Sequence, residues 1–246
     1  MWLVLAGLLA GYINAMAGAG SLLTLPALIF SGLGADVANA TNRIAVLFQT
    51  MATSYTYRRS GVGLRGRDLW ICLPAGFGTI AGSYVASQLS AGQMQLVIAL
   101  VMAAMVPALW LPKSTKVTPY RLGGLPLEWG SGMIFFAIGF YIGFIQAAAG
   151  ILILLYLGIV RGVSLVYANA LKVAITMLLT VLSLAVFVMT HVEIDLKRGL
   201  ILAVSTAVGG VVGARMAVRR GEGLIRIVLS ITIVGGAVKL IADMLR

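Results

Sequence analysis

Three long stretches of this sequence contain no Asp, Glu, Lys or Arg. They cover residues 1–35, 69–112 and 129–160. A helix needs only about 20 apolar residues to cross the hydrocarbon core of a bilayer, so each stretch can hold at least one membrane element. The composition agrees, because 61% of the residues are hydrophobic, 10% are charged and the mean hydropathy is +1.04. We therefore expect an all-α membrane protein surrounded by the lipid bilayer.

The basic residues that give a formal net charge of +11 are spread over several short polar stretches. This distribution is typical of loops that orient a membrane protein, and it does not predict a nucleic-acid partner. Cys72 and His191 are the only cysteine and the only histidine, which excludes a disulfide framework and a cysteine zinc site. No triad or ligand cluster is visible, so we expect neither an enzyme nor a bound cofactor or metal.

The N-terminal segment contains Ala15-Met16-Ala17, which resembles the cleavage site of a secretory signal. However, the start Met1-Trp2-Leu3-Val4 lacks the basic residues of such a signal. The glycine-rich stretch that follows also recurs later in the chain. We therefore expect this segment to belong to the folded protein.

An internal duplication runs through the sequence at an offset near 130. Gly11-Tyr12-Ile13-Asn14-Ala15-Met16-Ala17-Gly18 returns as Gly143-Phe144-Ile145-Gln146-Ala147-Ala148-Ala149-Gly150. Arg43-Ile44-Ala45-Val46 is echoed by Lys172-Val173-Ala174-Ile175, and the glycines of 78–82 by those of 209–213. We predict a first repeat at 1–112, a linker loop at 113–128 and a second repeat at 129–246, within a single integral membrane domain.

Each half begins with an apolar segment that is longer than one straight span and has small residues in its middle. We expect this segment to be broken or re-entrant, and to be followed by three transmembrane helices. The predicted segments are 1–31, 37–57, 67–89 and 92–111 in the first half and 131–160, 163–190, 196–218 and 223–244 in the second.

Loop charge indicates how the broken segments run, because Lys and Arg in short loops favour the cytoplasm. Residues 58–68, 113–128 and 215–226 have an excess of Lys and Arg, whereas 191–198 is balanced. If each broken segment crossed fully, the repeats would be parallel and 215–226 would lie outside. If each returns on the same side, the repeats are inverted and all four loops are placed as their charge demands. We predict inverted repeats, with parallel repeats as the alternative.

Two cations, Arg43 and Lys172, fall deep inside predicted membrane helices. Arg43 lies about 12 Å along its helix at 1.5 Å per residue, and a cation at that depth usually faces a cavity, a partner or a pathway. No acidic residue is predicted at the same depth, and an unpaired cation there favours an anionic ligand. The alternative is that both side chains extend to the membrane surface.

Polar residues surround these cations and the two predicted breaks. Interrupted helices expose backbone amides, and a helix N-terminus carries partial positive charge, which suits an anion. For each residue taken singly, ordinary interhelical hydrogen bonding is an equal alternative. The candidate substrate-binding residues are Arg43, Lys172, Asn14, Gln146, Asn39, Thr41, Asn42, Asn169, Gly18, Gly20, Ser21 and Gln49.

The stretch 11–28, Gly-Tyr-Ile-Asn-Ala-Met-Ala-Gly-Ala-Gly-Ser-Leu-Leu-Thr-Leu-Pro-Ala-Leu, followed by Ala40-Thr41-Asn42-Arg43, resembles the sulfite exporter TauE/SafE family of membrane permeases. The resemblance covers essentially the whole chain. It implies movement of sulfite, sulfonates or other organosulfur anions across the bacterial cytoplasmic membrane. The second break departs from the family's glycine-rich turn, because 147–150 reads Ala-Ala-Ala-Gly, so we expect it to be less open.

Together these features predict a multi-pass secondary transporter, an exporter of a small anion, with one central site between the repeats and alternating access. An inside-negative potential favours anion exit by about 2.3 kcal/mol per charge at 100 mV. Two alternatives stay open, namely proton-coupled anion uptake and a membrane subunit that transports nothing alone. The sequence also leaves a homo-oligomer open.

Overall fold

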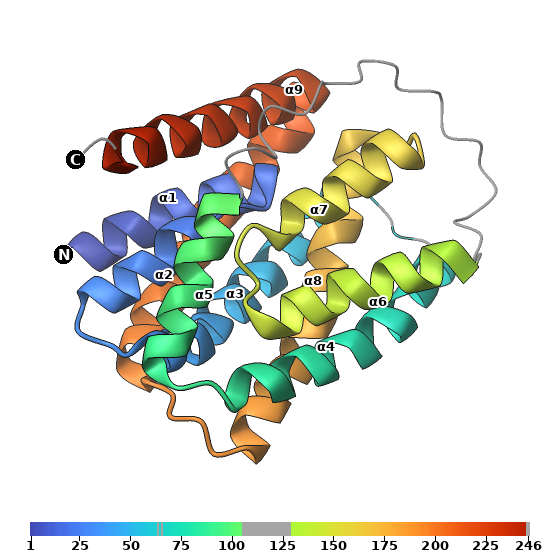
Figure 1. Ribbon diagram of the computed structural model, residues 1–246. Coiled ribbons are helices and arrows are strands. Elements are labelled where there is room, and N and C mark those ends of the chain that lie inside the picture. The colour runs from blue at the N-terminus through green and yellow to red at the C-terminus, as the bar shows by residue number, and fades with distance from the viewer. Residues whose placement is uncertain (63, 65, 105–128, 245–246) are drawn as a thin grey trace.

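The structure, a computed structural model, describes residues 1–62, 64, 66–104 and 129–244, and every regular element in this part is helical (Figure 1). The first half contains α1 (Trp2–Ala17), α2 (Ser21–Phe30), α3 (Ala35–Arg59), the 3₁₀ turn η1 (Gly66–Ile71), α4 (Cys72–Ser87) and α5 (Ala91–Ala104). The second contains α6 (Trp129–Phe144), α7 (Ala149–Leu155), the π-helical turn η3 (Tyr156–Val160), α8 (Leu165–Met189) and α9 (Leu196–Met244). The all-α prediction is confirmed for these residues.

Both predicted breaks are present. α1 stops at Ala17 and α2 begins at Ser21, while α6 stops at Phe144 and α7 begins at Ala149. The predicted interruption between 218 and 223 is wrong, because α9 continues through it as one helix. Figure 1 shows that α9 instead changes direction between its orange and red parts. The predicted linker loop 113–128 and the end of the predicted helix 92–111 lie outside the described residues.

The breaks form where the backbone adopts left-handed conformations. Gly18 has φ +75°, and in the second half Gln146 and Ala148 have φ +58° and +54°. Such angles cost little for glycine and more for other residues. After the first break the chain turns back, since Gly20 lies against the Ala10 carbonyl of α1, and Figure 1 shows α2 returning beside α1. The first break is therefore a reversal of the chain and more than a kink.

α3 and α8 have equal lengths of 25 residues and start 130 positions apart. At this offset Asn39 matches Asn169 and Asn42 matches Lys172. Arg43 then matches Val173. Counted from the starts of the two helices, the two buried cations are therefore one position apart.

The two halves interlock through close glycine contacts. α1 packs along α9, and α6 packs along α4, as Figure 1 shows. An added Cβ at Gly11 would lie 2.1 Å from the Thr206 carbonyl oxygen, and one at Gly143 would lie 2.1 Å from that of Thr79. Small residues let helix backbones approach this closely inside a membrane. Each half therefore places the first helix of its broken segment against the second helix that follows the broken segment in the other half, namely α9 or α4.

Three described helices are long and apolar enough to cross a membrane, namely Asp68–Ser87, Leu165–Met189 and Leu196–Arg220. α3 is equally long, but polar side chains that are buried inside the protein interrupt its apolar sequence. Large apolar side chains are exposed on the outer surface, for example Leu9, Phe77 and Val204. Soluble proteins rarely expose so much apolar surface, and a lipid environment accounts for it.

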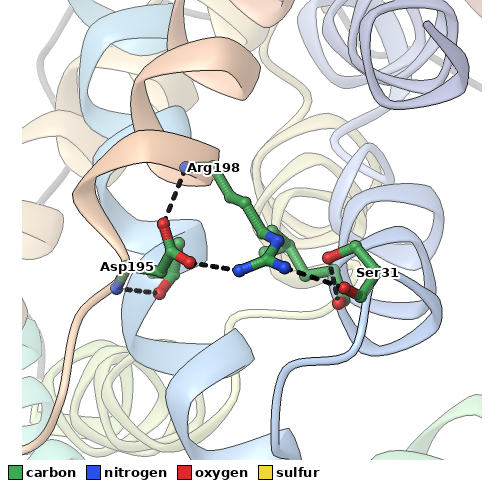
Figure 2. A network of polar contacts seen from close by, with 5 residues as sticks. Ser31, Asp195 and Arg198 are labelled. Carbon is green, nitrogen blue, oxygen red and sulfur yellow. Dashed lines mark hydrogen bonds and ion pairs between the residues drawn. The ribbon is translucent and has the colours of Figure 1, made fainter.

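A polar network fixes the connection between α8 and α9 to the first half (Figure 2). The Asp195 backbone amide donates to Thr41 Oγ1 at 3.0 Å, and Arg198 Nη2 donates to the Ser31 carbonyl at 3.0 Å. Arg198 also forms an ion pair with Asp195. The Arg198 backbone amide and its guanidinium hold the pKa of the Asp195 carboxyl below its ordinary value.

Candidate functional site

The two helix breaks meet at the centre of the molecule. An added Cβ at Gly18 would lie 2.4 Å from Gly150 Cα, and an added Cβ at Gly150 would lie 2.4 Å from Gly18 Cα. Real Cβ atoms do not come this close to backbone atoms, so both positions require glycine. The start of α7 therefore lies directly against the end of α1.

A small cavity lies beside this contact. Its free space of about 10 Å³ admits roughly one water molecule. Both breaks and both long central helices contribute to its wall, which consists of Asn14, Gly18, Ser21, Val46, Thr50, Gln146, Ala149, Gly150, Lys172, Val173 and Thr176.

Lys172 is the cation of this cavity. Only 2% of its surface is exposed, and its Nζ donates to the Asn14 carbonyl at 2.8 Å and to Asn169 Oδ1 at 2.7 Å. An ammonium group has three N–H donors. Contacts among the described residues occupy two of them, which leaves the third for a ligand in the cavity.

Arg43 is fully buried but is not part of the cavity wall. Its guanidinium donates to the carbonyls of Ile142 and Gly143 and to Gln146 Oε1 at 2.9 Å. It also lies over the Phe187 ring, 5.4 Å from the centroid. Arg43 therefore holds the end of α6 and the second break in place.

Each cation binds the carboxyl end of the broken helix that belongs to the other half. Lys172 reaches the end of α1, and Arg43 reaches the end of α6. These carbonyls carry the negative end of a helix dipole, which favours a nearby cation. The sequence predicts no acidic partner for either cation, and backbone and amide oxygens take the place of carboxylates here.

Two asparagines reinforce this arrangement in the same way in both halves. Asn39 Nδ2 donates to the Phe144 carbonyl at 2.9 Å, and Asn169 Nδ2 donates to the Met16 carbonyl at 3.0 Å. Neither residue belongs to the cavity wall. Both stabilise the ends of the broken helices.

Asn14 and Gln146 line the cavity and also tie the breaks to the long helices. Asn14 Oδ1 accepts from the Gly20 amide at 3.3 Å, and Asn14 Nδ2 donates to Gln49 Oε1. Gln146 Nε2 donates to Thr180 Oγ1 at 2.7 Å. These hydrogen bonds agree with the structural role that the sequence suggested for the two amides, and substrate contact stays a prediction.

Four other predicted residues lie outside the cavity wall. Gly20 packs against α1, Gln49 bonds Asn14, Asn42 accepts from Thr24 Oγ1 at 2.6 Å, and Thr41 accepts from the Asp195 amide. Within the described part of the chain, Asn42 Nδ2, Gln49 Nε2 and Arg43 Nε are buried and have no hydrogen-bond partner.

Two hydroxyl residues of the wall, Thr50 and Thr176, were not predicted from the sequence. Thr176 follows Lys172 by one helical turn, and Thr50 follows Val46 by one turn. This four-residue spacing on α8 and α3 was the available signal. Thr176, Ser21 and Lys172 give the cavity hydroxyl and ammonium donors, whereas the Thr50 hydroxyl donates to the Val46 carbonyl of its own helix.

This donor set suits a small oxyanion better than a metal or a cation. Every polar side chain in the wall can donate a hydrogen bond, and none is acidic. Among the described residues, no group of three or more His, Cys, Asp or Glu side chains could hold a metal ion.

The chain is similar to known membrane transporter proteins over nearly its whole length. The family model "Sulfite exporter TauE/SafE" matches residues 3–240. "Probable membrane transporter protein YfcA" of Escherichia coli (strain K12) is 29% identical over 98% of this chain and 89% of its own length. "Probable membrane transporter protein ORF9" of Sinorhizobium sp is 24% identical over 98% of this chain and 92% of its own. No solved structure matches the chain.

Proposed function

The chain belongs to the sulfite exporter TauE/SafE family, and we propose that it is a secondary transporter that carries a small anion through one central site. Its relatives are membrane transporters, not enzymes. The proposed substrates are sulfite, a sulfonate or another organosulfur anion.

The observation that carries this proposal is the cavity between the two breaks. It combines a buried ammonium group, three hydroxyl groups and two amides with no acidic side chain. A charged side chain inside a membrane protein commonly marks the substrate pathway. We propose that Lys172 Nζ, Ser21 and Thr176 bind the substrate oxygens, while Arg43 positions the second break.

Transport requires this site to open. The free space of about 10 Å³ is too small for a multi-atom anion, so α1–α2 and α6–α7 must separate when substrate enters. The contact between Gly18 and Gly150 is the point at which they would part. Alternating access would then open the cavity to each side in turn.

The proposed topology has two inverted repeats. Inverted repeats in the bacterial cytoplasmic membrane would put 58–68 and 215–226 on the cytoplasmic side. Export is the direction that the membrane potential favours for an anion.

A flux assay tests the proposal. Purified protein in liposomes is assayed for movement of sulfite and of a small sulfonate, with an uncharged compound of similar size as the negative control. Lys172→Met removes the cavity cation, and Lys197→Met removes an exposed lysine as the matched control. We expect Lys172→Met to abolish flux and Lys197→Met to preserve it.

Two outcomes would overturn the proposal. Equal flux in both variants would show that Lys172 does not bind the substrate. Absence of flux in wild-type protein that is well folded would favour a subunit that depends on a partner. A pH gradient that drives accumulation would keep the site but change export to proton-coupled uptake.

A further inference from the structure

A second, larger pocket lies one helical turn from the central cavity. Its volume is about 370 Å³, within the range of small-ligand pockets. It is lined by Ser54, Tyr57, Arg58, Val62, Leu64 and Ala170. It therefore lies between the end of α3, the segment that follows α3, and α8.

One face of α3 connects the two spaces. Val46 and Thr50 line the central cavity, and Ser54 and Arg58 line the pocket. These four residues are spaced by four, so they lie in one stripe along the helix. The stripe is about 18 Å long at 1.5 Å per residue. It becomes more polar toward the basic end of the helix.

Tyr57 lines the pocket and belongs to the same buried cluster as Val173, which lines the central cavity. Tyr57 is 1% exposed and packs with Met16, Ala170 and Val173. Its hydroxyl donates to the Ala15 carbonyl at 3.3 Å, next to the first break. Movement of the first break would therefore move Tyr57 and join the two spaces.

The matching positions on α8, in the second half, carry apolar side chains. At the offset of 130, Ser54 and Arg58 match Leu184 and Val188, and Tyr57 matches Phe187. Phe187 lies in an apolar cluster with Ala40, Met94 and Ile98. Among the described residues, a polar stripe thus leads from the cavity toward the basic end of α3, whereas its counterpart on α8 ends in apolar side chains.

We propose that the pocket lined by Ser54, Tyr57 and Arg58 is the mouth through which small anions reach or leave the central cavity on the side of the basic loops. Arg58 raises the local concentration of anions at this mouth. Tyr57 closes it toward the cavity. This inference rests on the proposed transport function for its direction, but the mouth itself is tested without transport.

Thiol labelling provides that test. In a Cys72→Ser background, Ser54→Cys and Leu184→Cys form a pair at matched positions in α3 and α8. An anionic, membrane-impermeant methanethiosulfonate ethylsulfonate is applied to inside-out and right-side-out vesicles. We expect Ser54→Cys to react from the side that carries the basic loops, and Leu184→Cys to resist labelling. Ala170→Cys and Ala40→Cys are a second matched pair in case Ser54→Cys misfolds.

The charge of the mouth is tested with a cationic methanethiosulfonate reagent beside the anionic one. Arg58→Gln should lower the ratio of anionic to cationic labelling rates at Ser54→Cys by about threefold to tenfold. Arg59→Gln changes the same charge on the same helix, but Arg59 does not line the pocket, so the ratio should change little.

The proposal is overturned if both members of each pair react alike, if Ser54→Cys and Ala170→Cys both resist labelling from the basic side, or if Arg58→Gln and Arg59→Gln shift the ratio equally. Labelling needs no flux. One-sided labelling without sulfite flux would therefore support the mouth and contradict the proposed substrate. Sulfite flux without one-sided labelling would support the substrate and contradict the mouth.

Discussion

Replacing Gly18 with alanine tests the contact between the two breaks. Gly18 has φ +75°, where alanine costs about 1–2 kcal/mol. The added Cβ would also lie 2.4 Å from Gly150 Cα, well inside ordinary carbon contacts of about 3.5–4.0 Å. Overpacking of this kind typically costs a further 1–3 kcal/mol, roughly. The expected loss of stability is therefore about 2–5 kcal/mol in total.

Two further variants separate these contributions. Gly32→Ala measures only the cost of placing alanine at a positive φ, because Gly32 has φ +95° and an added Cβ there has no atom within 4 Å. Gly150→Ala measures only the cost of the steric overlap, since its added Cβ would lie 2.4 Å from Gly18 Cα and its φ is not positive. We expect Gly18→Ala to destabilise most, and the other two to destabilise by about 1–3 kcal/mol each.

Thermal unfolding of the purified protein in one detergent gives the comparison. A change of 1 kcal/mol moves Tm by about 2–4 °C in a chain of this size. Gly18→Ala should therefore melt lower than Gly32→Ala by several degrees. Equal melting temperatures for Gly18→Ala and Gly32→Ala, with Gly150→Ala unchanged from wild type, would show that the breaks do not touch.

Three other predictions follow from buried or charged contacts. Arg43→Lys should lose about 2–4 kcal/mol, because lysine cannot replace the branched guanidinium contacts to the second break, and Arg59→Lys should melt like wild type. Gly143→Ala should destabilise, since its Cβ would overlap a carbonyl oxygen of α4 at 2.1 Å, whereas an added Cβ at Gly132 meets nothing; melting curves of both variants check this. Asp195 has a lowered pKa, so its contribution is present above the ordinary carboxyl pKa and is lost as pH falls through the lowered value. The gap in Tm between wild type and Asp195→Asn should therefore narrow below about pH 4, and a constant gap would contradict this.

The breaks could be predicted from sequence because their causes are local. A glycine and small-residue stretch inside a long apolar segment is visible without any tertiary information, as at Gly18. The wrong prediction of an interruption at 218–223 also has a local cause. Arg219, Arg220 and Glu222 resemble a polar loop, but such residues are good helix formers and extend α9.

The partners of the buried cations could not be predicted in this way. Lys172 donates to the carbonyl of Asn14, 158 positions away, and backbone carbonyls carry no sequence signature. Thr50 was missed for a related reason. A threonine in a helix commonly bonds a preceding carbonyl, as Thr50 does with Val46 at 2.8 Å, so its place in the cavity depends on packing between halves.

Equilibrium binding of radiolabelled sulfite to the purified protein tests the central claim most directly. One site between the two halves predicts one saturable binding site per chain, which is lost in Lys172→Met and retained in Lys197→Met. Binding that survives in Lys172→Met, or a stoichiometry of two per chain, would contradict a single site built around Lys172.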